Sequence, residues 1–327
     1  MLESATGEIF TLGVADLHAS QLHPVIFGTE LTTSQAELNG LAQTGRRAVN
    51  DQIQVVNLLV NQVVIQHLAR LAVAFTEHAT AAFVAALSAV EFRPGDRILT
   101  TRHDYVSNQI QYLSLARRFG VEVVRAPDGP DGGVDVGAMA DLARRLRPRL
   151  VAMTQIPTNS GLVQDVATVG RACRELDLRF LVDGCQSVGQ MPIDVGALGC
   201  DFFSATSRKF LRGPRGAGFL YVSDRVLDAG MEPLFPDLRG AEWIEGDLDQ
   251  PAPTARRFES WEFAWGLVLG TGVAARYALD LGLDWIRDRS WGLAAETRTA
   301  LARLPGVRVL DRGETLCAIT TCAMEGR

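Results

Sequence analysis

Short apolar runs alternate with helical patterns from about residue 71 onward, and this feature restricts the possible folds of the 327-residue chain more than any other. The runs are rich in β-branched residues, as strands are, and the stretches between them are long enough to cross from one parallel strand to the next. The alternation is typical of the α/β class, in which helices flank a mostly parallel sheet. The predicted strands are Arg97–Thr101, Val121–Arg125, Leu150–Gln155, Phe180–Asp183, Asp201–Ala205 and Ala217–Val222, and the predicted helices include Asn108–Phe119, Val136–Leu146 and Val166–Leu176.

Both ends of the chain differ from this central region. Residues 1–70 show no clear hydrophobic period apart from a helical pattern over 51–71, and we interpret them as an atypical N-terminal segment. Residues 71–285 are predicted to form the large domain. Residues 286–327 are expected to begin an α+β small domain with a strand at Val307–Leu310, and too little chain follows to complete that domain.

Composition excludes several classes of protein. Apolar residues make up 47% of the chain, which is enough for a sizeable core, and the formal charge of -6 includes no long run of either sign. We therefore expect no nucleic-acid or membrane partner, but small molecules and other protein chains. The five cysteines form no CxxC pair, so we expect a reducing compartment and no metal site. With no signal-peptide pattern at the N-terminus, the predicted location is cytoplasmic.

One lysine, Lys209, lies between a predicted strand and the glycine-rich turn Gly213–Gly216. Nearby cations such as Arg208 would lower the pKa of its amine and make it a better nucleophile at neutral pH. Taken alone, the segment is better explained as a solvated lysine in a basic loop. The neighbouring segments reverse that preference, because they supply the other parts of a site for pyridoxal 5′-phosphate (PLP).

A PLP site needs an acid that pairs with the ring nitrogen, besides its lysine. Asp183 ends an apolar run, so it lies at the carboxyl end of a buried strand, where a carboxylate can meet that nitrogen. The alternative is that Asp183 caps a helix, since aspartate is favoured there. Spacing favours the PLP interpretation, because Gln186 follows three residues later and Lys209 follows one further strand, Asp201–Ala205.

A PLP site also needs a cradle for the phosphate. Ala79 and Thr80 precede the predicted helix Ala81–Val90, and small or hydroxylated residues at a helix start leave backbone N–H groups free for a phosphate. An ordinary capped helix would look much the same. Thr206 and Arg208 would complete the cradle from the other side, with Arg208 supplying charge.

Together these segments resemble the class V aminotransferase and cysteine desulfurase family of fold-type I PLP-dependent enzymes. The resemblance covers roughly Leu71 to Leu310. Residues 157–161 and 206–209 are more similar to the isopenicillin N epimerase-like and ergothioneine-type C–S lyase branch than to the housekeeping desulfurases. The residues that carry the family resemblance are Leu181–Val195, Leu198–Phe202, Arg208–Lys209 and Gly213–Pro214.

The resemblance implies a role for each candidate residue. It implies that Lys209 forms the Schiff base and moves the α-proton, that Asp183 pairs with the pyridinium nitrogen, and that Gln186 donates to the phenolic oxygen. Tyr105 is similar in place to the aromatic residue that stacks on the ring, with His103 as the competing candidate. The other implied cofactor ligands are Ala79, Thr80, Thr206 and Arg208 at the phosphate, the last where many relatives have histidine, and either Thr158 or Asn159 facing the cofactor.

The implied activity is that of a lyase, desulfurase, epimerase or aminotransferase acting on an amino acid. Family members are homodimers, so residues 258–261 are expected to reach the partner's cofactor. No desulfurase cysteine is nominated. A nicotinamide-dependent Rossmann oxidoreductase is excluded, because Gly213–Gly218 lacks the G-x-G-x-x-G spacing and precedes a strand.

Both chain ends depart from the family pattern. We find no family counterpart before Leu71, and Thr320–Arg327 do not resemble the family's continuation. These departures leave an alternative of a different class, in which the protein is a truncated and catalytically impaired PLP-binding or scaffold protein.

Overall fold

The computed structural model describes residues 2–3, 9–10 and 72–324 and divides the chain into two compact units, Met1–Val55 and Val56–Arg327. In the first unit, the described strands β1 (Leu2–Glu3) and β2 (Ile9–Phe10) pair antiparallel. The helix predicted over 51–71 lies outside the described residues. The domain boundary predicted after residue 70 stays a prediction, as does the one after residue 285, which falls within a helix of the second unit.

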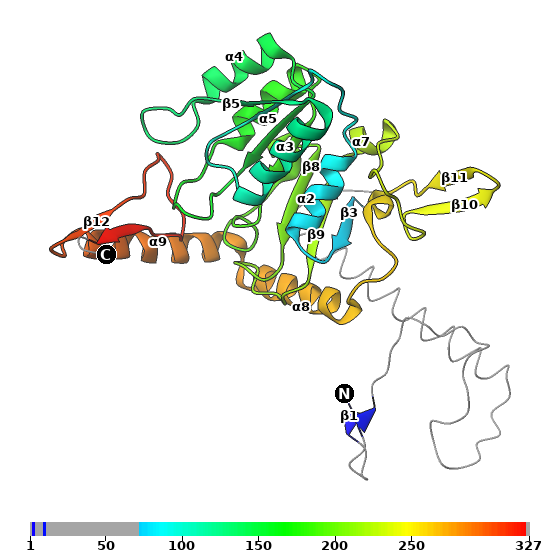
Figure 1. The fold of residues 1–327 in the computed structure, drawn as a ribbon. Helices are drawn as coiled ribbons and strands as arrows, with labels where there is room; N and C mark the ends of the chain where they lie inside the picture. Colours follow the sequence, from blue (N-terminus) through cyan, green and yellow to red (C-terminus); the bar gives the residue numbers. More distant parts are fainter. Residues whose placement is uncertain (1, 4–8, 11–71, 325–327) are drawn as a thin grey trace. The chain divides into compact units, whose positions relative to one another are not determined.

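A seven-stranded sheet forms the centre of the second unit, in the order β3-β9-β8-β7-β6-β4-β5 (Figure 1). All neighbouring pairs are parallel except the two that β9 makes. The α/β class with a mostly parallel sheet is thus confirmed. The strands are β3 (Val73–Thr76), β4 (Arg97–Thr100), β5 (Glu122–Arg125), β6 (Leu150–Thr154), β7 (Phe180–Asp183), β8 (Phe202–Thr206) and β9 (Gly218–Val222).

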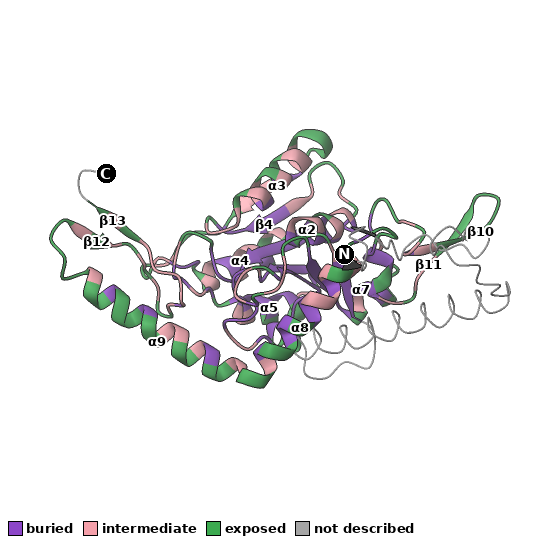
Figure 2. Cartoon of the chain, turned by 90° about the horizontal axis from the view of Figure 1, so that it is seen from below, coloured by how far each residue is buried: buried purple, intermediate pink, exposed green. Residues whose placement is uncertain are grey.

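Helices cover both faces of this sheet, and the inner strands are buried on both sides (Figure 2). Alternate residues of a strand enter different cores: Leu181 packs with α2 and α3, whereas Phe180 and Val182 pack with α4, α5 and α8. Aspartates begin three of these helices, because Asp135, Asp165 and Asp194 each accept a backbone N–H in the first turn. The helices are α2 (Ala79–Ser88), α3 (Val106–Phe119), α4 (Val136–Leu146), α5 (Val166–Glu175), α6 (Val195–Leu198), α7 (Asp224–Asp228) and α8 (Trp265–Leu281).

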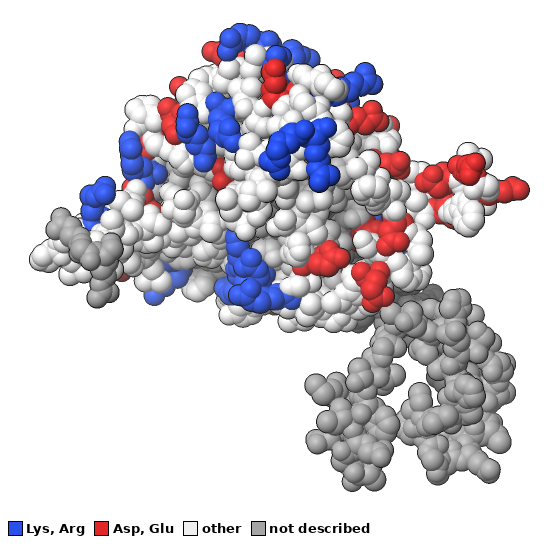
Figure 3. Space-filling view, viewed as in Figure 1, with Lys and Arg blue, Asp and Glu red and all other residues white. Residues whose placement is uncertain are grey.

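After the sheet, the chain forms a hairpin of β10 (Ala241–Glu245) and β11 (Leu248–Pro251) and a short 3-10 helix, η1 (Ala255–Phe258). The hairpin projects from the sheet and its helices (Figure 1). On the face shown in Figure 3, basic and acidic side chains are interspersed, and acidic residues gather on this hairpin.

Beyond α8 lies an α+β segment. Helix α9 (Leu283–Leu301) leads to β12 (Val307–Val309), which pairs antiparallel with β13 (Cys322–Met324). The sequence predicted β12. It did not predict β13, because the three residues of β13 carry no pattern that distinguishes a strand from a loop. Across the described part of the chain, every helix is too short or too polar to cross a membrane.

Candidate functional site

The candidate residues follow strands that end at one edge of the sheet. β3, β4, β6, β7 and β8 all run in the same direction, so their carboxyl ends meet there. Ligands of open α/β sheets bind at this edge. The candidates that lie at these strand ends or in the segments that follow them are Ala79, Thr80, Tyr105, Thr158, Asn159, Asp183, Gln186, Thr206, Arg208 and Lys209.

Asp183 is the last residue of β7 and is only 3% exposed. Its Oδ1 accepts the Cys185 N–H at 2.9 Å, and its Oδ2 accepts Nδ2 of Asn108 at 3.0 Å. Burial raises the pKa of this carboxyl, although both hydrogen bonds lower it. The next helix, α6, begins only at Val195, so the alternative that Asp183 caps a helix is wrong. A buried carboxylate of this kind is suited to a cationic partner.

Asp104 and Asn108 belong to the same network, and neither was nominated from the sequence. Asn108 is 1% exposed on α3, and its Nδ2 also donates to Oδ1 of Asp104 at 3.0 Å. The signal that could have found them is a spacing of four from Asp104 through Asn108 to Tyr112, which brings polar side chains together at the start of α3.

Lys209 Nζ lies 6.0 Å from the centroid of the Tyr105 ring. Tyr105 is held at the start of α3 by its backbone N–H, which donates to Oγ1 of Thr154 at 3.1 Å. His103, the competing candidate, instead pairs through Nε2 with Asp128 at 3.1 Å. The tyrosine is therefore the candidate whose ring stands near the lysine.

Cys185 lies within electrostatic range of both Asp183 and Lys209. Burial and the Asp183 charge raise the pKa of its thiol, and the Lys209 charge lowers it. The thiol is thus a poor nucleophile at neutral pH, as expected for a packed cysteine beside the acid. No group of three or more His, Cys, Asp or Glu side chains in the described ranges could hold a metal ion.

The N-terminus of α2 leaves donors free at the site. His78 caps the helix, accepting the Ala81 N–H at its Nδ1 over 3.0 Å, while no hydrogen bond between described residues uses the N–H of Ala79 or Thr80. Gly218 on β9 lies against this turn, and a Cβ there would come within 2.8 Å of the Ala79 nitrogen. The glycine therefore lets the helix start approach the sheet closely, which gives two adjacent N–H donors of the kind that bind phosphate.

The opposite side of this turn carries the other two candidate phosphate ligands. Thr206 ends β8 and is 3% exposed, and its hydroxyl donates to the Ala217 carbonyl at 3.3 Å. Arg208 is exposed. Its guanidinium is therefore free to meet an anion from solvent.

Gln186 lies in the turn that follows β7, 7% exposed. This turn packs against the Lys209 loop at Gly189, whose φ is +88° and where a Cβ would lie 2.3 Å from the Leu211 nitrogen. Gln190 ties the turn down, because its Nε2 donates to the Gln186 carbonyl at 2.5 Å. Its Oε1 accepts Nε1 of Trp291 on α9 at 3.0 Å, which links the turn to the C-terminal segment.

The loop after β6 is held by the same C-terminal segment. The N–H of Cys317 donates to the Gly161 carbonyl at 2.7 Å, and the Gly161 N–H donates to Oδ1 of Asp311 at 2.9 Å. Thr158 and Asn159 are both exposed on this loop, and no contact favours either as the residue that faces the cofactor.

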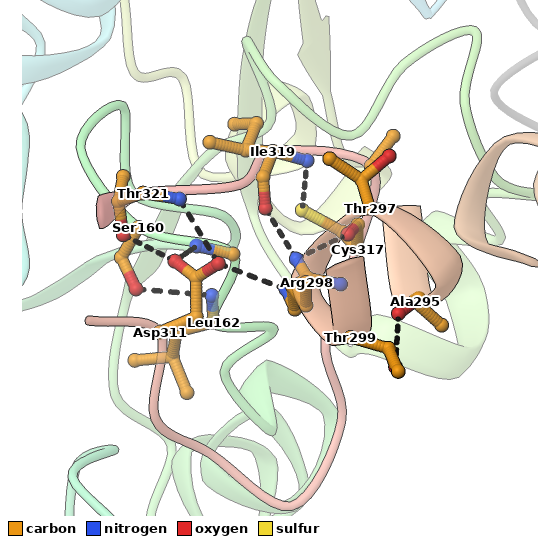
Figure 4. Close-up of polar contacts among 12 residues, drawn as sticks. Ser160, Leu162, Ala295, Thr297, Arg298, Thr299, Asp311, Cys317, Ile319 and Thr321 are labelled. Carbon is orange, nitrogen blue, oxygen red and sulfur yellow. Dashed lines mark hydrogen bonds and ion pairs between the residues drawn. The ribbon is translucent and has the colours of Figure 1, made fainter. Parts of the chain in front are cut away.

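Asp311 is the centre of this attachment. Its side chain is wholly buried, and Nε of Arg298 contacts its Oδ2 at 2.8 Å. Figure 4 shows Arg298 reaching from α9 to Asp311 and to the carbonyls of Cys317 and Ile319. Burial raises the pKa of Asp311, but hydrogen bonds from Thr321, Arg298 and the Gly161 N–H outweigh it and lower the pKa. The ion pair therefore joins α9, the chain after β12 and the candidate cofactor loop.

The fold is that of an open, mostly parallel α/β sheet with its candidate residues gathered at the carboxyl edge, the edge at which such sheets bind ligands. Residues 35–326 match the aminotransferase class-V family, and the chain belongs to that family. The match extends beyond the predicted range of 71–310, so the expectation that the chain ends do not resemble the family is wrong for residues 35–70 and 320–326. The end segments carry none of the short catalytic motifs on which that expectation depended.

Curated relatives include cysteine desulfurases. A probable cysteine desulfurase of Methanothermobacter thermautotrophicus is 30% identical over 240 residues, which cover 72% of this chain and 58% of the relative. A cysteine desulfurase of Dickeya dadantii is 30% identical over 223 residues, which cover 67% and 52%. The chain thus spans little more than half the length of these relatives.

Similar solved structures share the fold. An apo cysteine desulfurase from Thermococcus onnurineus superposes with a TM-score of 0.77 at 22% identity, covering 88% of this chain and 70% of that one. A lysine-to-alanine mutant of C-DES, with glycine covalently linked to its PLP cofactor, gives a TM-score of 0.76 at 20% identity and covers 86% and 74%. Another structure, with a TM-score of 0.74 at 22% identity and coverage of 86% and 75%, is a complex of the cystine C–S lyase C-DES with its product cysteine persulfide.

Proposed function

We propose that this chain binds PLP at the carboxyl edge of its sheet, with Lys209 as the covalent attachment point. The observation that carries the proposal is that Lys209 is the only lysine in a sequence with 32 basic residues. Arginine serves at the other 31 positions, but a guanidinium stays protonated and cannot take part in imine chemistry. The single primary side-chain amine therefore stands near the Tyr105 ring, at the edge where Asp183 also ends its strand.

The candidate site fits PLP at both ends of the cofactor, the ring nitrogen and the phosphate. Asp183 is buried, and burial raises its pKa, so a pyridinium N–H would give its carboxylate a cationic partner, which no ion pair between described residues provides. The unused N–H groups of Ala79 and Thr80, with Thr206 and Arg208, would hold the phosphate.

Each remaining residue has a defined task. When bound, PLP withdraws electrons from the substrate carbon that carries the amino group. Lys209 Nζ would take the proton from that carbon and return it, Gln186 would donate to the phenolic oxygen, and Tyr105 would cover one face of the ring. Thr158 or Asn159 would contact the cofactor from the loop after β6.

We infer an amino acid as the substrate and cleavage of a carbon–sulfur bond as the reaction type. The similarity to a cystine C–S lyase and to cysteine desulfurases supports this choice. Desulfuration, transamination and epimerisation are the other reactions of the proposed range, and the isopenicillin N epimerase-like or ergothioneine-type branch stays a prediction. The homodimer, in which residues 258–261 would reach the partner's cofactor, also stays a prediction. The cytoplasmic location stays a prediction as well.

The single lysine allows a sharp test of the cofactor assignment. After incubation with PLP and reduction by borohydride, intact-mass analysis is expected to find one cofactor per wild-type chain, on the peptide that contains Lys209. Lys209→Ala and the charge-retaining control Lys209→Arg are expected to carry none, because neither has a side-chain amine. An adduct that persists in Lys209→Arg, or a folded wild type without one, would contradict the proposal.

Turnover separates the enzyme from the scaffold alternative. The loaded wild type is expected to release sulfide or persulfide from L-cysteine or L-cystine, and the Lys209 variants are not. A protein that binds PLP through Lys209 but turns over no amino acid would instead support the catalytically impaired, PLP-binding alternative.

Gly218→Ala tests the phosphate cradle. The added Cβ would lie 2.6 Å from the His78 carbonyl carbon and must displace the start of α2, so the affinity for PLP is expected to fall about tenfold, the loss of roughly one hydrogen bond to a charged group. The control is Gly292→Ala on α9, where a Cβ meets nothing within 4 Å. Equilibrium titration followed by cofactor absorbance measures both, and equal affinities would show that the α2 start does not hold the phosphate.

A further inference from the structure

A chain of polar side chains runs from Asp183 back into the protein. Nδ2 of Asn108 donates to Oδ2 of Asp183 and to Oδ1 of Asp104, each at 3.0 Å. Asn108 is 1% exposed, so water does not compete for these hydrogen bonds. The amide therefore has one orientation, because turning it over would face its carbonyl toward two carboxylates.

Asp104, like the Asn108 amide that it orients, is fixed by hydrogen bonds. All of its neighbours donate to it, so it acts as an acceptor only, as an ionised carboxylate does. Burial and the Asp104 charge raise the pKa of Tyr112 well above its usual value, which keeps that hydroxyl protonated as a donor. The donors besides Asn108 are Oγ1 of Thr100 at 3.0 Å, the Tyr112 hydroxyl at 2.8 Å, Oγ1 of Thr154 at 2.5 Å and the Tyr105 N–H at 2.8 Å.

We propose that Asp104 is a positioning residue for the cofactor, which acts through Asn108 on Asp183 and through the backbone of Tyr105 on the ring that faces Lys209. This inference rests on the proposed binding of PLP. One carboxylate thereby orients the partner of the ring nitrogen and anchors the start of the helix that carries the stacking ring. Its negative charge also favours a protonated ring nitrogen over a neutral one.

The charges around Asp183 give the direction of the effect. After burial, which raises the pKa of Asp183 most, the Asp104 charge raises it further, whereas the bonds from Cys185 and Asn108 lower it. The other titratable groups that act on Asp183, or on Cys185 beside it, are Tyr112, Lys209 and Arg208. With Asp104 in place, a proton shared between Asp183 and the ring nitrogen is therefore held more tightly.

The test compares PLP with its 1-deaza analogue, in which a C–H replaces the ring nitrogen, so that the ring cannot be protonated. Asp104→Asn is expected to weaken the binding of PLP about tenfold, which corresponds to one pKa unit at the ring nitrogen, and to weaken binding of the analogue by less than about twofold. Asp141→Asn on α4 is the matched control, because among the described residues that exposed carboxylate pairs with Arg144 at the surface. Equal weakening of both ligands would mean a merely structural role and would overturn the proposal.

A second readout uses the apoprotein and does not depend on the cofactor. Hydrogen exchange of the backbone amides at 183–187 is expected to quicken in Asp104→Asn and in Asn108→Ala, because the Cys185 N–H is bonded to the carboxylate that they release. It is expected to stay unchanged in Asp141→Asn. If the wild type failed to bind PLP, the proposed function would be wrong, but the exchange experiment would still test whether Asp104 positions Asp183 through Asn108. Unchanged exchange in Asp104→Asn would overturn that positioning role.

Discussion

Replacing Asp183 with asparagine is expected to weaken PLP binding by a factor on the order of 10²–10³, while the apoprotein keeps its stability to within about 1 kcal/mol. The variant would remove the carboxylate that faces the positive ring, and breaking a buried charge pair costs about 3–5 kcal/mol. In the apoprotein, the variant loses the free energy of one hydrogen bond. This loss is offset, because the variant also removes a buried charge, whose transfer out of water costs free energy.

The pH dependence of apoprotein stability checks the second half of that prediction. Burial raises the pKa of Asp183 above its ordinary 3.8, so the folded protein binds this proton more tightly than the unfolded chain does. The ionised Asp183 carboxyl therefore lowers the free energy of unfolding at pH values above the raised pKa. This destabilisation disappears as the pH falls below the ordinary pKa of 3.8. Asp183→Asn is expected to lack this dependence in urea unfolding.

The control for Asp183→Asn is Asp280→Asn, at an exposed position on α8. It is expected to change neither the affinity for PLP nor the pH dependence of unfolding. If Asp183→Asn bound PLP as tightly as Asp280→Asn, the assignment of Asp183 to the ring nitrogen would be wrong.

Arg298→Met is expected to destabilise the second unit by about 3–5 kcal/mol, because it leaves the wholly buried Asp311 without its cationic partner. The carbonyls of Cys317 and Ile319 lose a donor in the same change. Because Asp311 positions the Gly161 N–H, the loop with Thr158 and Asn159 is expected to loosen first.

Urea unfolding measures this effect, with Arg303→Met, an exposed arginine after α9, as the control. The pKa of Asp311 is lowered in the folded protein, so its contribution is present above its ordinary 3.8 and is lost as the pH falls through the lowered value. The difference between wild type and Arg298→Met is therefore expected to narrow in acid. A midpoint equal to that of Arg303→Met would show that this ion pair does not hold the segment.

Local patterns were enough to predict most of the sheet. The six predicted strands agree with β4 to β9 to within one residue at each end, because buried parallel strands are continuous apolar runs bounded by turns. The antiparallel direction of β9 was not predicted, since an apolar run has no direction of its own. β3 was missed because Val73–Thr76 is short and merges with the apolar residues before it.

Some residues of the candidate site could also be predicted from the sequence, and others could not. Asp183 and Lys209 could be nominated because Asp183 ends a predicted strand and Lys209 follows one, and the direction of parallel strands then places their ends at one edge. Asp104 and Asn108 could not, because their importance comes from the side chains that they meet. Arg298 and Asp311 lie 13 residues apart in sequence and reach the loop at Gly161 only through tertiary contacts.

The sequence alone determined the α/β class, most strands of the sheet and the identity of the one lysine, because hydrophobic period and residue chemistry are local properties. Only the tertiary structure decided which polar groups meet. It buried Asp183 against Asn108, freed the first two N–H groups of α2 beside Gly218 and tied the loop after β6 to the C-terminal segment. Hydrogen bonds and burial depend on distances between segments far apart in the chain, and no local pattern encodes those distances.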